Sequence, residues 1–193
     1  ENFDFYLLYK YNHSTLIKYF LKMKKMQSNN KQISNQKKNS SNSISTKLQQ
    51  AANNNNYDVV YSLLLNENTI CDSCFKGCTK MEKIVIPPSI TSIEKYAFME
   101  CTSLKEIFIP SSVISIEDFA FISCIALKKI SIPFSVKSIG ICPFQECKSL
   151  QKISIHSSFI SFKKHPFGSC ESLTDISLPS SITSIPNGCF NLC

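Results

Sequence analysis

The chain contains no arginine and no tryptophan among its 193 residues, and only four glycines. The arginine guanidinium is the side chain best suited to bind phosphate or guanine through two hydrogen bonds, so its absence argues against specific binding of nucleic acid. The few glycines form no glycine-rich loop that could hold a phosphate. No run of eighteen or more apolar residues occurs, so we expect no transmembrane segment.

The three histidines do not indicate a catalytic centre. The histidines are His13, His156 and His165. None of them has a nearby pair of a cysteine and an acid, apart from residues that the repeats described below already explain. The acidic residues are scattered instead of paired as a general acid and base would be. We therefore expect no enzymatic activity, no cofactor and no metal.

The first third of the chain differs in composition from the remainder. Residues 1–69 hold nine lysines, four acids and thirteen asparagines, whereas residues 70–193 hold twelve lysines, ten acids and two asparagines. The net charge of +7 is therefore concentrated in the first third. A boundary is predicted near Asn68. Because the chain begins at Glu1 without methionine, we expect it to be a fragment.

Three segments are predicted before this boundary. Residues 1–27 have apolar side chains at helical spacing and lysines near their end, which indicates an amphipathic helical segment covering a core, or alternatively a basic membrane-surface anchor. Residues 28–46, rich in Asn, Ser and Lys, predict a disordered linker because they have few apolar side chains to offset the entropy of ordering. Residues 47–69 predict a helical cap of two short helices. The run AANNNNYDVVYSLLL in this cap resembles the helix pair of an ankyrin repeat but lacks the Thr-Pro-Leu-His turn.

A strict internal repeat begins after the boundary. Cysteine recurs every 23 residues, and so does a phenylalanine, without an insertion or deletion. The two series are Cys78, Cys101, Cys124, Cys147, Cys170 and Cys193, and Phe75, Phe98, Phe121, Phe144, Phe167 and Phe190. A fixed period of this length predicts a stacked solenoid, in which each repeat forms one coil and neighbouring coils cover each other's apolar faces.

The stretch SLKEIFIPSSVISIEDFAFISC shows how one coil is built. The spacing of Ile107 and Ile109 places both on the inner face of a short strand, so Glu106, Phe108 and Pro110 are expected to face outward. Proline lacks an amide hydrogen and is expected to end the strand. The apolar residues that follow are three positions apart, which predicts a helical or 3₁₀ outer arc.

The stretch CTSLKEIFIPSSVISIEDFAF resembles the treponemal-type leucine-rich repeat of BspA-like proteins, through L-x-x-I-x-I-P, a later I-x-x-I, and A-F before the cysteine. The resemblance covers about residues 70–193. It implies an α/β repeat solenoid, a horseshoe with a parallel concave sheet and short helical or 3₁₀ convex turns, with about five full coils behind the helical N-terminal region. Departures at Pro143, Pro166 and His156 are expected to distort the outer arc of the third and fourth coils without breaking the stack.

The ten cysteines are interpreted as packing residues. CDSCFKGC contains C-x-x-C, but Cys78 belongs to the 23-residue series and Cys74 takes the place of Ala97 and Ala120, which argues against four converging zinc ligands. Neighbouring coils lie close enough for disulfides. We expect free thiols, because a buried thiol packs as a small apolar residue. The resemblance to leucine-rich repeats also implies that the cysteine of the 23-residue series faces inward and bonds the backbone of the turn.

The outward residues of the concave strands form the predicted protein-binding surface: Lys83, Val85, Glu106, Phe108, Lys129, Ser131, Lys152, Ser154, His156, Asp175 and Ser177, with the prolines Pro87, Pro110, Pro133 and Pro179 beside them. Its middle is basic. An outward Phe108 is poorly explained by stability, and aromatic residues are typical anchors of interfaces. We expect a protein partner with acidic groups opposite Lys129 and Lys152.

Three functions are compatible with this pattern. The first is a non-enzymatic scaffold that binds a protein partner, the second a cell-surface adhesin or antigen, and the third a structural spacer in a larger chain. A signal peptide or anchor in the full-length chain would favour the second, and an upstream ankyrin array would favour an intracellular scaffold. Ile176, Leu178, Ile182 and Ile185 of the last coil have no following coil in the sequence, which predicts self-association through that end.

Overall fold

The computed structural model describes residues 41–156, 162–182 and 184–193, all of which lie in the compact unit Ser41–Cys193. The predicted amphipathic segment 1–27 and residues 28–40 of the predicted linker lie outside the described residues. Residues 41–46 are helical, so the expectation of a linker was wrong for them. They belong to helix α3 (Ser41–Asn53), whose apolar residues Ile44, Leu48 and Ala52 recur at helical spacing and contact the core.

Helix α4 (Tyr57–Leu64) follows after a short asparagine turn. The side chain of Asn56 accepts a hydrogen bond of 3.4 Å from the amide of Val59 and so caps the start of the helix. Val60 and Leu64 are buried against the first apolar residues of the solenoid. This confirms the helical N-terminal region that was part of the predicted fold.

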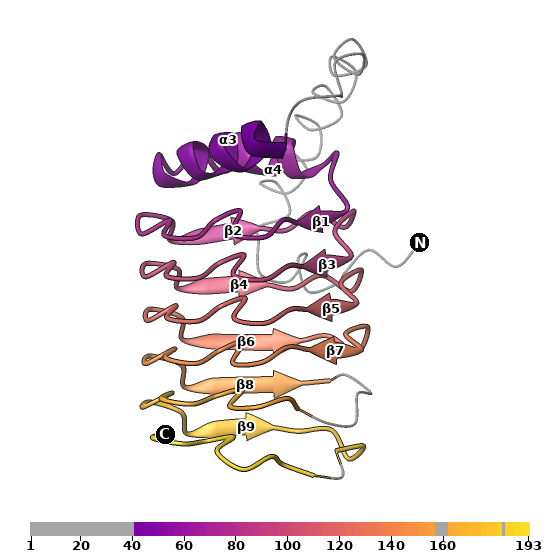
Figure 1. Ribbon diagram of the computed structural model, residues 1–193, viewed down its shortest axis with the longest axis vertical. Helices are drawn as coiled ribbons and strands as arrows, with labels where there is room; N and C mark the ends of the chain where they lie inside the picture. The colour runs from indigo at the N-terminus through magenta and orange to yellow at the C-terminus, as the bar shows by residue number, and fades with distance from the viewer. Residues whose placement is uncertain (1–40, 157–161, 183) are drawn as a thin grey trace, which may run out of the picture. The chain divides into compact units, whose positions relative to one another are not determined.

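The repeats form a parallel solenoid, which confirms the predicted fold class (Figure 1). We number coils one to five from residues 81, 104, 127, 150 and 173. Each contributes one strand to a five-stranded sheet: β2 (Lys83–Val85), β4 (Glu106–Phe108), β6 (Lys129–Ile132), β8 (Lys152–Ile155) and β9 (Asp175–Ser177). The paired residues are 23 positions apart throughout, for example Ile84 with Ile107, as the gap-free period requires.

The outer arc contains an element that the sequence analysis did not predict. A second parallel sheet of four two-residue strands runs along it, made of β1 (Thr69–Ile70), β3 (Ser92–Ile93), β5 (Ser115–Ile116) and β7 (Ser138–Ile139). The three-residue spacing of Val113 and Ile116, which we interpreted as helical, comes instead from a turn that leads into this strand. Among the described residues, the connections between the sheets are turns without a helix.

The core is one continuous column between the two sheets. The phenylalanines of the 23-residue series stack face to face from Phe75 to Phe190, with ring centroids 5.0 to 5.9 Å apart. The isoleucines of the five-stranded sheet pack beside them, and those of coils one to four are at most 8% exposed. No coil covers its own faces, so the stack depends on neighbouring coils for stability.

The departures from the repeat leave the stack intact. The carbonyl groups of Pro143 and Pro166 accept hydrogen bonds of 2.8 and 3.1 Å from Phe121 and Phe144 of the preceding coils. His156 replaces a proline and donates its amide to Ile132 at 2.9 Å, a bond that proline could not make. The stack therefore continues through the third and fourth coils, as expected.

Candidate protein-binding surface

The outward face of the five-stranded sheet carries the residues predicted from the sequence. In each strand the side chains alternate, so that the isoleucines point into the core while their neighbours are exposed or half-buried. The structure brings ten of the predicted residues onto this face, and His156 follows directly after β8 and is exposed. We call these eleven residues the sheet face.

The sheet face consists of two columns of side chains, each running across the strands in register. The first column contains Lys83, Glu106, Lys129, Lys152 and Asp175. The second contains Val85, Phe108, Ser131, Ser154 and Ser177. The first column is charged throughout, whereas the second changes from apolar at β2 and β4 to hydroxyl groups at β6, β8 and β9.

Lys129 and Lys152 lie opposite each other in the middle of the charged column. Like charges on facing strand positions repel, and each lysine ion-pairs with the acid on its other side: Lys129 with Glu106 at 3.7 Å and Lys152 with Asp175 at 2.6 Å. All four side chains are about half exposed, so these pairs stabilise the fold by less than about 1 kcal/mol. The lysines thus remain accessible to a partner.

The apolar part of the sheet face is smaller than the sequence indicated. Phe108 and Val85 are half-buried, and the prolines expected beside them are turned inward. Pro87 and Pro110 are buried, which corrects their outward assignment, because the chain bends into a turn here and the carbonyl of Pro110 accepts the amide of Val113 at 3.1 Å. Among the phenylalanines that the structure describes, Phe134 is the most exposed, at 68%. Phe134 was not among the predicted surface residues, although it stands where other coils have Pro or Ser.

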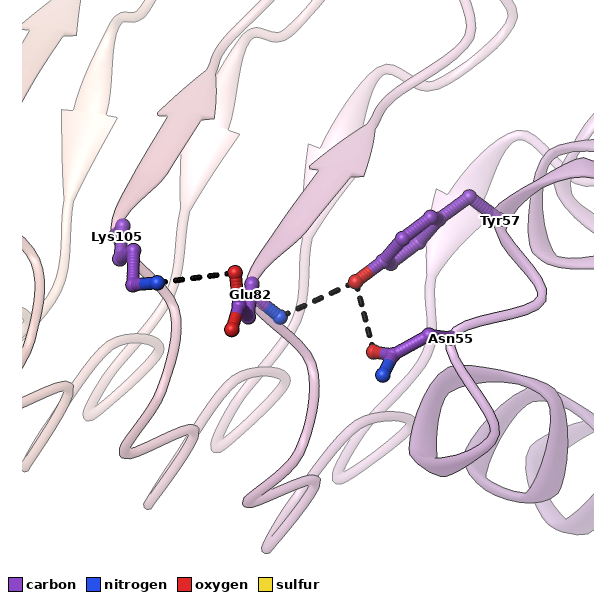
Figure 2. A network of polar contacts seen from close by, with 4 residues as sticks. All are labelled: Asn55, Tyr57, Glu82 and Lys105. Atoms are coloured by element: carbon purple, nitrogen blue, oxygen red, sulfur yellow. Dashed lines mark hydrogen bonds and ion pairs between the residues drawn. The ribbon is translucent and has the colours of Figure 1, made fainter.

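Tyr57 of helix α4 completes the edge of the sheet next to β2 (Figure 2). Its hydroxyl accepts the amide of Glu82 at 3.3 Å and donates to Asn55 at 2.7 Å, while Glu82 ion-pairs with Lys105 at 2.9 Å. In the next coil the equivalent amide, that of Lys105, donates to the carbonyl of Glu82. The tyrosine hydroxyl therefore replaces the carbonyl that a preceding coil would supply. The Nζ atom of Lys83 lies over the Tyr57 ring, 5.5 Å from its centroid.

The cysteines of the repeat series bond the backbone of the neighbouring coil, as predicted. The thiols of Cys101, Cys124, Cys147, Cys170 and Cys193 each donate to the carbonyl of a core phenylalanine, at 2.9 to 3.3 Å. Burial raises the pKa of Cys78 to about 11 and that of Cys170 to about 12. These thiols stay protonated at neutral pH, so they are poor nucleophiles.

Cys71 and Cys74 differ, because a disulfide joins them. Free thiols were expected, so the expectation was wrong for this pair. Their Cα atoms are 5.2 Å apart because Ser73 has a left-handed backbone (φ 56°), which folds the chain back so that Cys74 donates its amide to Cys71. Within the described residues, no three His, Cys, Asp or Glu side chains are arranged to hold a metal ion.

The family model for the BspA type leucine-rich repeat region matches residues 68–193 in six copies. The chain belongs to this family. The match begins at Asn68, where the composition changes, and includes every coil described above. No curated protein matches the sequence.

Solved structures of other leucine-rich repeat proteins are similar to this chain. A leucine-rich repeat protein of T. pallidum is 33% identical over 55% of this chain and 50% of its own, with a TM-score of 0.54. One from Bacteroides ovatus is 26% identical over 57% of this chain and 35% of its own, with a TM-score of 0.44. A leucine-rich cell surface protein from Faecalibacterium prausnitzii is 24% identical over 63% of this chain and 48% of its own, with a TM-score of 0.43. The chain thus spans half or less of the length of these relatives.

The fifth coil is less well covered than the others. Ile176, Leu178 and Ile182 are half-buried and Ile185 is 50% exposed, whereas the equivalent residues described in coils one to four are at most 8% exposed. Self-association of the polypeptide through this coil stays a prediction. In the described part of the chain, no helix is both long and apolar enough to cross a membrane.

Proposed function

We propose that the chain is a non-enzymatic scaffold that binds a protein partner through the sheet face. The observation that supports this most is the adjacent pair Lys129 and Lys152, held in register at the centre of the face. The contact between the two lysines does not itself stabilise the sheet, because like charges on facing strand positions repel. An acidic partner would gain from both lysines, because it would approach two accessible positive charges at a fixed spacing.

The half-buried Phe108 supplies the apolar anchor of the proposed interface. It lies in register with Val85 on the neighbouring strand, so the two side chains form one apolar strip beside Lys83 and Glu106. Aromatic residues at the centre of interfaces commonly contribute most of the binding free energy. The arrangement fits a partner segment with an apolar side chain flanked by carboxylates.

The experiment uses a partner isolated with the parent chain and then compares variants by surface plasmon resonance. Phe108→Ser should weaken binding by on the order of 1–3 kcal/mol, mainly through faster dissociation. The double variant Lys129→Glu/Lys152→Glu should slow association and reduce its dependence on salt.

Matched controls lie away from the sheet face. Ile114 is 52% exposed near the second sheet, so Ile114→Ser removes a comparable apolar group there. Lys76→Glu/Lys164→Glu reverses two exposed charges in turns. Control variants that reduce binding as much as the sheet-face variants would contradict the proposal. If the chain were only a structural spacer, all variants would bind the partner equally. An adhesin would use the same face but would require display of the chain outside the cell.

A further inference from the structure

One turn position has a left-handed backbone both before coil one and in each of coils one to five. Its residues are Ser73, Tyr96, Phe119, Cys142, His165 and Gly188, with φ between 48° and 75°. Glycine adopts this conformation without steric cost, whereas a bulky side chain there is an outlier. The chain itself uses serine and glycine at two of these positions. The backbone therefore does not require the aromatic residues Tyr96 and Phe119.

The two aromatic rings stack on each other outside the core. Their centroids are 5.3 Å apart and their planes differ by 3°. Both are half-buried, in contrast to the fully buried core pair Phe98 and Phe121 two residues further on. The residues before and after them in the same column, Ser73 and Cys142, are small. The outer face of each ring therefore adjoins a small side chain.

Further apolar side chains come from the same turns. The amide of Met99 donates to the carbonyl of Tyr96 at 3.0 Å, and that of Ile122 donates to Phe119 at 3.2 Å. Both Met99 and Ile122 are half-buried. Tyr96, Phe119, Met99 and Ile122 form a small apolar surface, which we call the turn patch. It is built from the turns between the two sheets and shares no residue with the sheet face.

The turns that carry the patch are acidic. Residues 94–100 and 117–123 contain four carboxylates and one lysine. That lysine, Lys95, ion-pairs with Asp118 at 3.5 Å, and Lys163 of a later coil approaches the same carboxylate at 3.8 Å. Both lysines therefore lie at Asp118, and the remaining carboxylates of the two turns are Glu94, Glu100 and Glu117. Glu94 and Glu117 begin the same turns that contain the rings. An aromatic surface with carboxylates around it favours a cation, because the ring face and the carboxylates both attract positive charge.

We propose that the turn patch binds a basic segment of a protein partner, with a lysine or arginine side chain over the outer face of Tyr96 or Phe119 and with Glu94 and Glu117 as counter-charges. The strained backbone at both aromatic residues is then explained by binding, which serine or glycine at these positions could not provide. This surface is independent of the sheet face, and the two select partner segments of opposite charge.

The test uses the full chain and fluorescein-labelled octa-arginine, octa-lysine and neutral octa-serine peptides, with binding followed by fluorescence anisotropy. The parent should prefer the basic peptides. The variant Tyr96→Ser/Phe119→Ser uses a residue that the chain already accepts at Ser73, and it should weaken binding by about fivefold or more. Glu94→Gln/Glu117→Gln should also weaken binding and lessen its salt dependence. Phe134→Ser, at an exposed phenylalanine outside the patch, is the matched control and should bind like the parent.

A second variant separates binding from stability. Tyr96→Gly/Phe119→Gly removes the rings and also the steric strain, so circular dichroism should show a folded protein that has lost its preference for basic peptides. The proposal is overturned if any of the three double variants binds the basic peptides like the parent, or if the parent binds octa-serine equally well. Because the variants leave Lys129 and Phe108 intact, failure here is distinguishable from failure of the sheet-face proposal.

Discussion

The carboxylate of Asp118 accepts a hydrogen bond of 2.8 Å from the backbone amide of Ile141, one coil further along the solenoid. Lys95 of coil one and Lys163 of coil four approach the same carboxylate at 3.5 and 3.8 Å. One side chain thus links four successive coils. The hydrogen bond from Ile141 lowers the pKa of Asp118 below its ordinary value, and the two lysines act in the same direction against partial burial.

Replacing Asp118 should therefore destabilise the solenoid in a way that depends on pH. Asp118→Ala removes a hydrogen bond to a charged group and should cost about 1.5–3 kcal/mol of unfolding free energy at pH 7, measured by urea denaturation. Asp118→Asn keeps an acceptor but loses the charge, so it should cost less.

The sign of the pH dependence follows from the lowered pKa. The charged carboxylate stabilises the folded state above the unfolded pKa of about 3.9, and this contribution is lost as the pH falls through the lower folded-state pKa. The difference between parent and Asp118→Asn should therefore be largest near neutral pH and shrink below about pH 4. A difference that stays constant from pH 6 to pH 3 would contradict this assignment.

Gly140 is needed because the backbone of the preceding coil lies against it. A Cβ atom added here would lie 2.3 Å from the amide nitrogen of Asp118 and 2.5 Å from the carbonyl carbon of Glu117. Gly140→Ala should destabilise the protein by about 1–3 kcal/mol, since the clash is with backbone that cannot move aside without disturbing the stack. Thermal unfolding followed by circular dichroism measures this.

Gly168→Ala is the matched control, because its added Cβ would meet neighbouring atoms no closer than 3.7 Å. It should leave the melting temperature almost unchanged. The double variant Gly140→Ala/Asp118→Ala should remain as unstable as Gly140→Ala or more so, since the backbone clash persists without the carboxylate. Recovery of stability in the double variant would mean that only the side chain of Asp118 had been displaced.

The strand pairing could be predicted from the sequence, because the 23-residue period determines it. Features that depend on very short strands or on single residues could not be predicted. The 23-residue spacing determined which residues pair across the sheet, for example Lys129 with Lys152, and so placed the outward residues within the strands. It failed for Pro87 and Pro110, which are buried where the chain bends after the strand. The second sheet was missed because two residues per strand are too few to show an alternating pattern. The bond from Ile141 to Asp118 was missed because the residue at this repeat position changes from coil to coil, so the period does not predict it.

The strained turns offer a way to stabilise the protein. Glu100 has φ 59° and is exposed, and its amide bonds the carbonyl of Ile122 in the next coil. Relief of the left-handed strain is worth about 1–2 kcal/mol, and the greater freedom of glycine in the unfolded chain costs about 0.5–1 kcal/mol. Glu100→Gly should therefore raise the unfolding free energy, by up to about 1.5 kcal/mol. Guanidinium denaturation at constant m-value measures the change.

Lys128→Gly is the control for this prediction. Lys128 is also exposed, but its backbone is not left-handed, so glycine brings only the entropic cost. It should lower the unfolding free energy by about 0.5–1 kcal/mol. If both glycine variants lost stability equally, strain at Glu100 would be absent.

The hydroxyl of Tyr57 should protect the first strand of the five-stranded sheet from opening. Tyr57→Phe keeps the ring beneath Lys83 but leaves the amide of Glu82 without its acceptor, which should cost about 0.5–1.5 kcal/mol. Hydrogen exchange measured by NMR should become faster at the amide of Glu82, while the amide of Lys128 in coil three, which donates to Lys105, should exchange as in the parent. Tyr57→Leu removes the ring as well and should accelerate exchange at Glu82 further. Unchanged exchange at Glu82 in Tyr57→Phe would mean that the sheet edge is held by the packing of helix α4 and not by this hydroxyl.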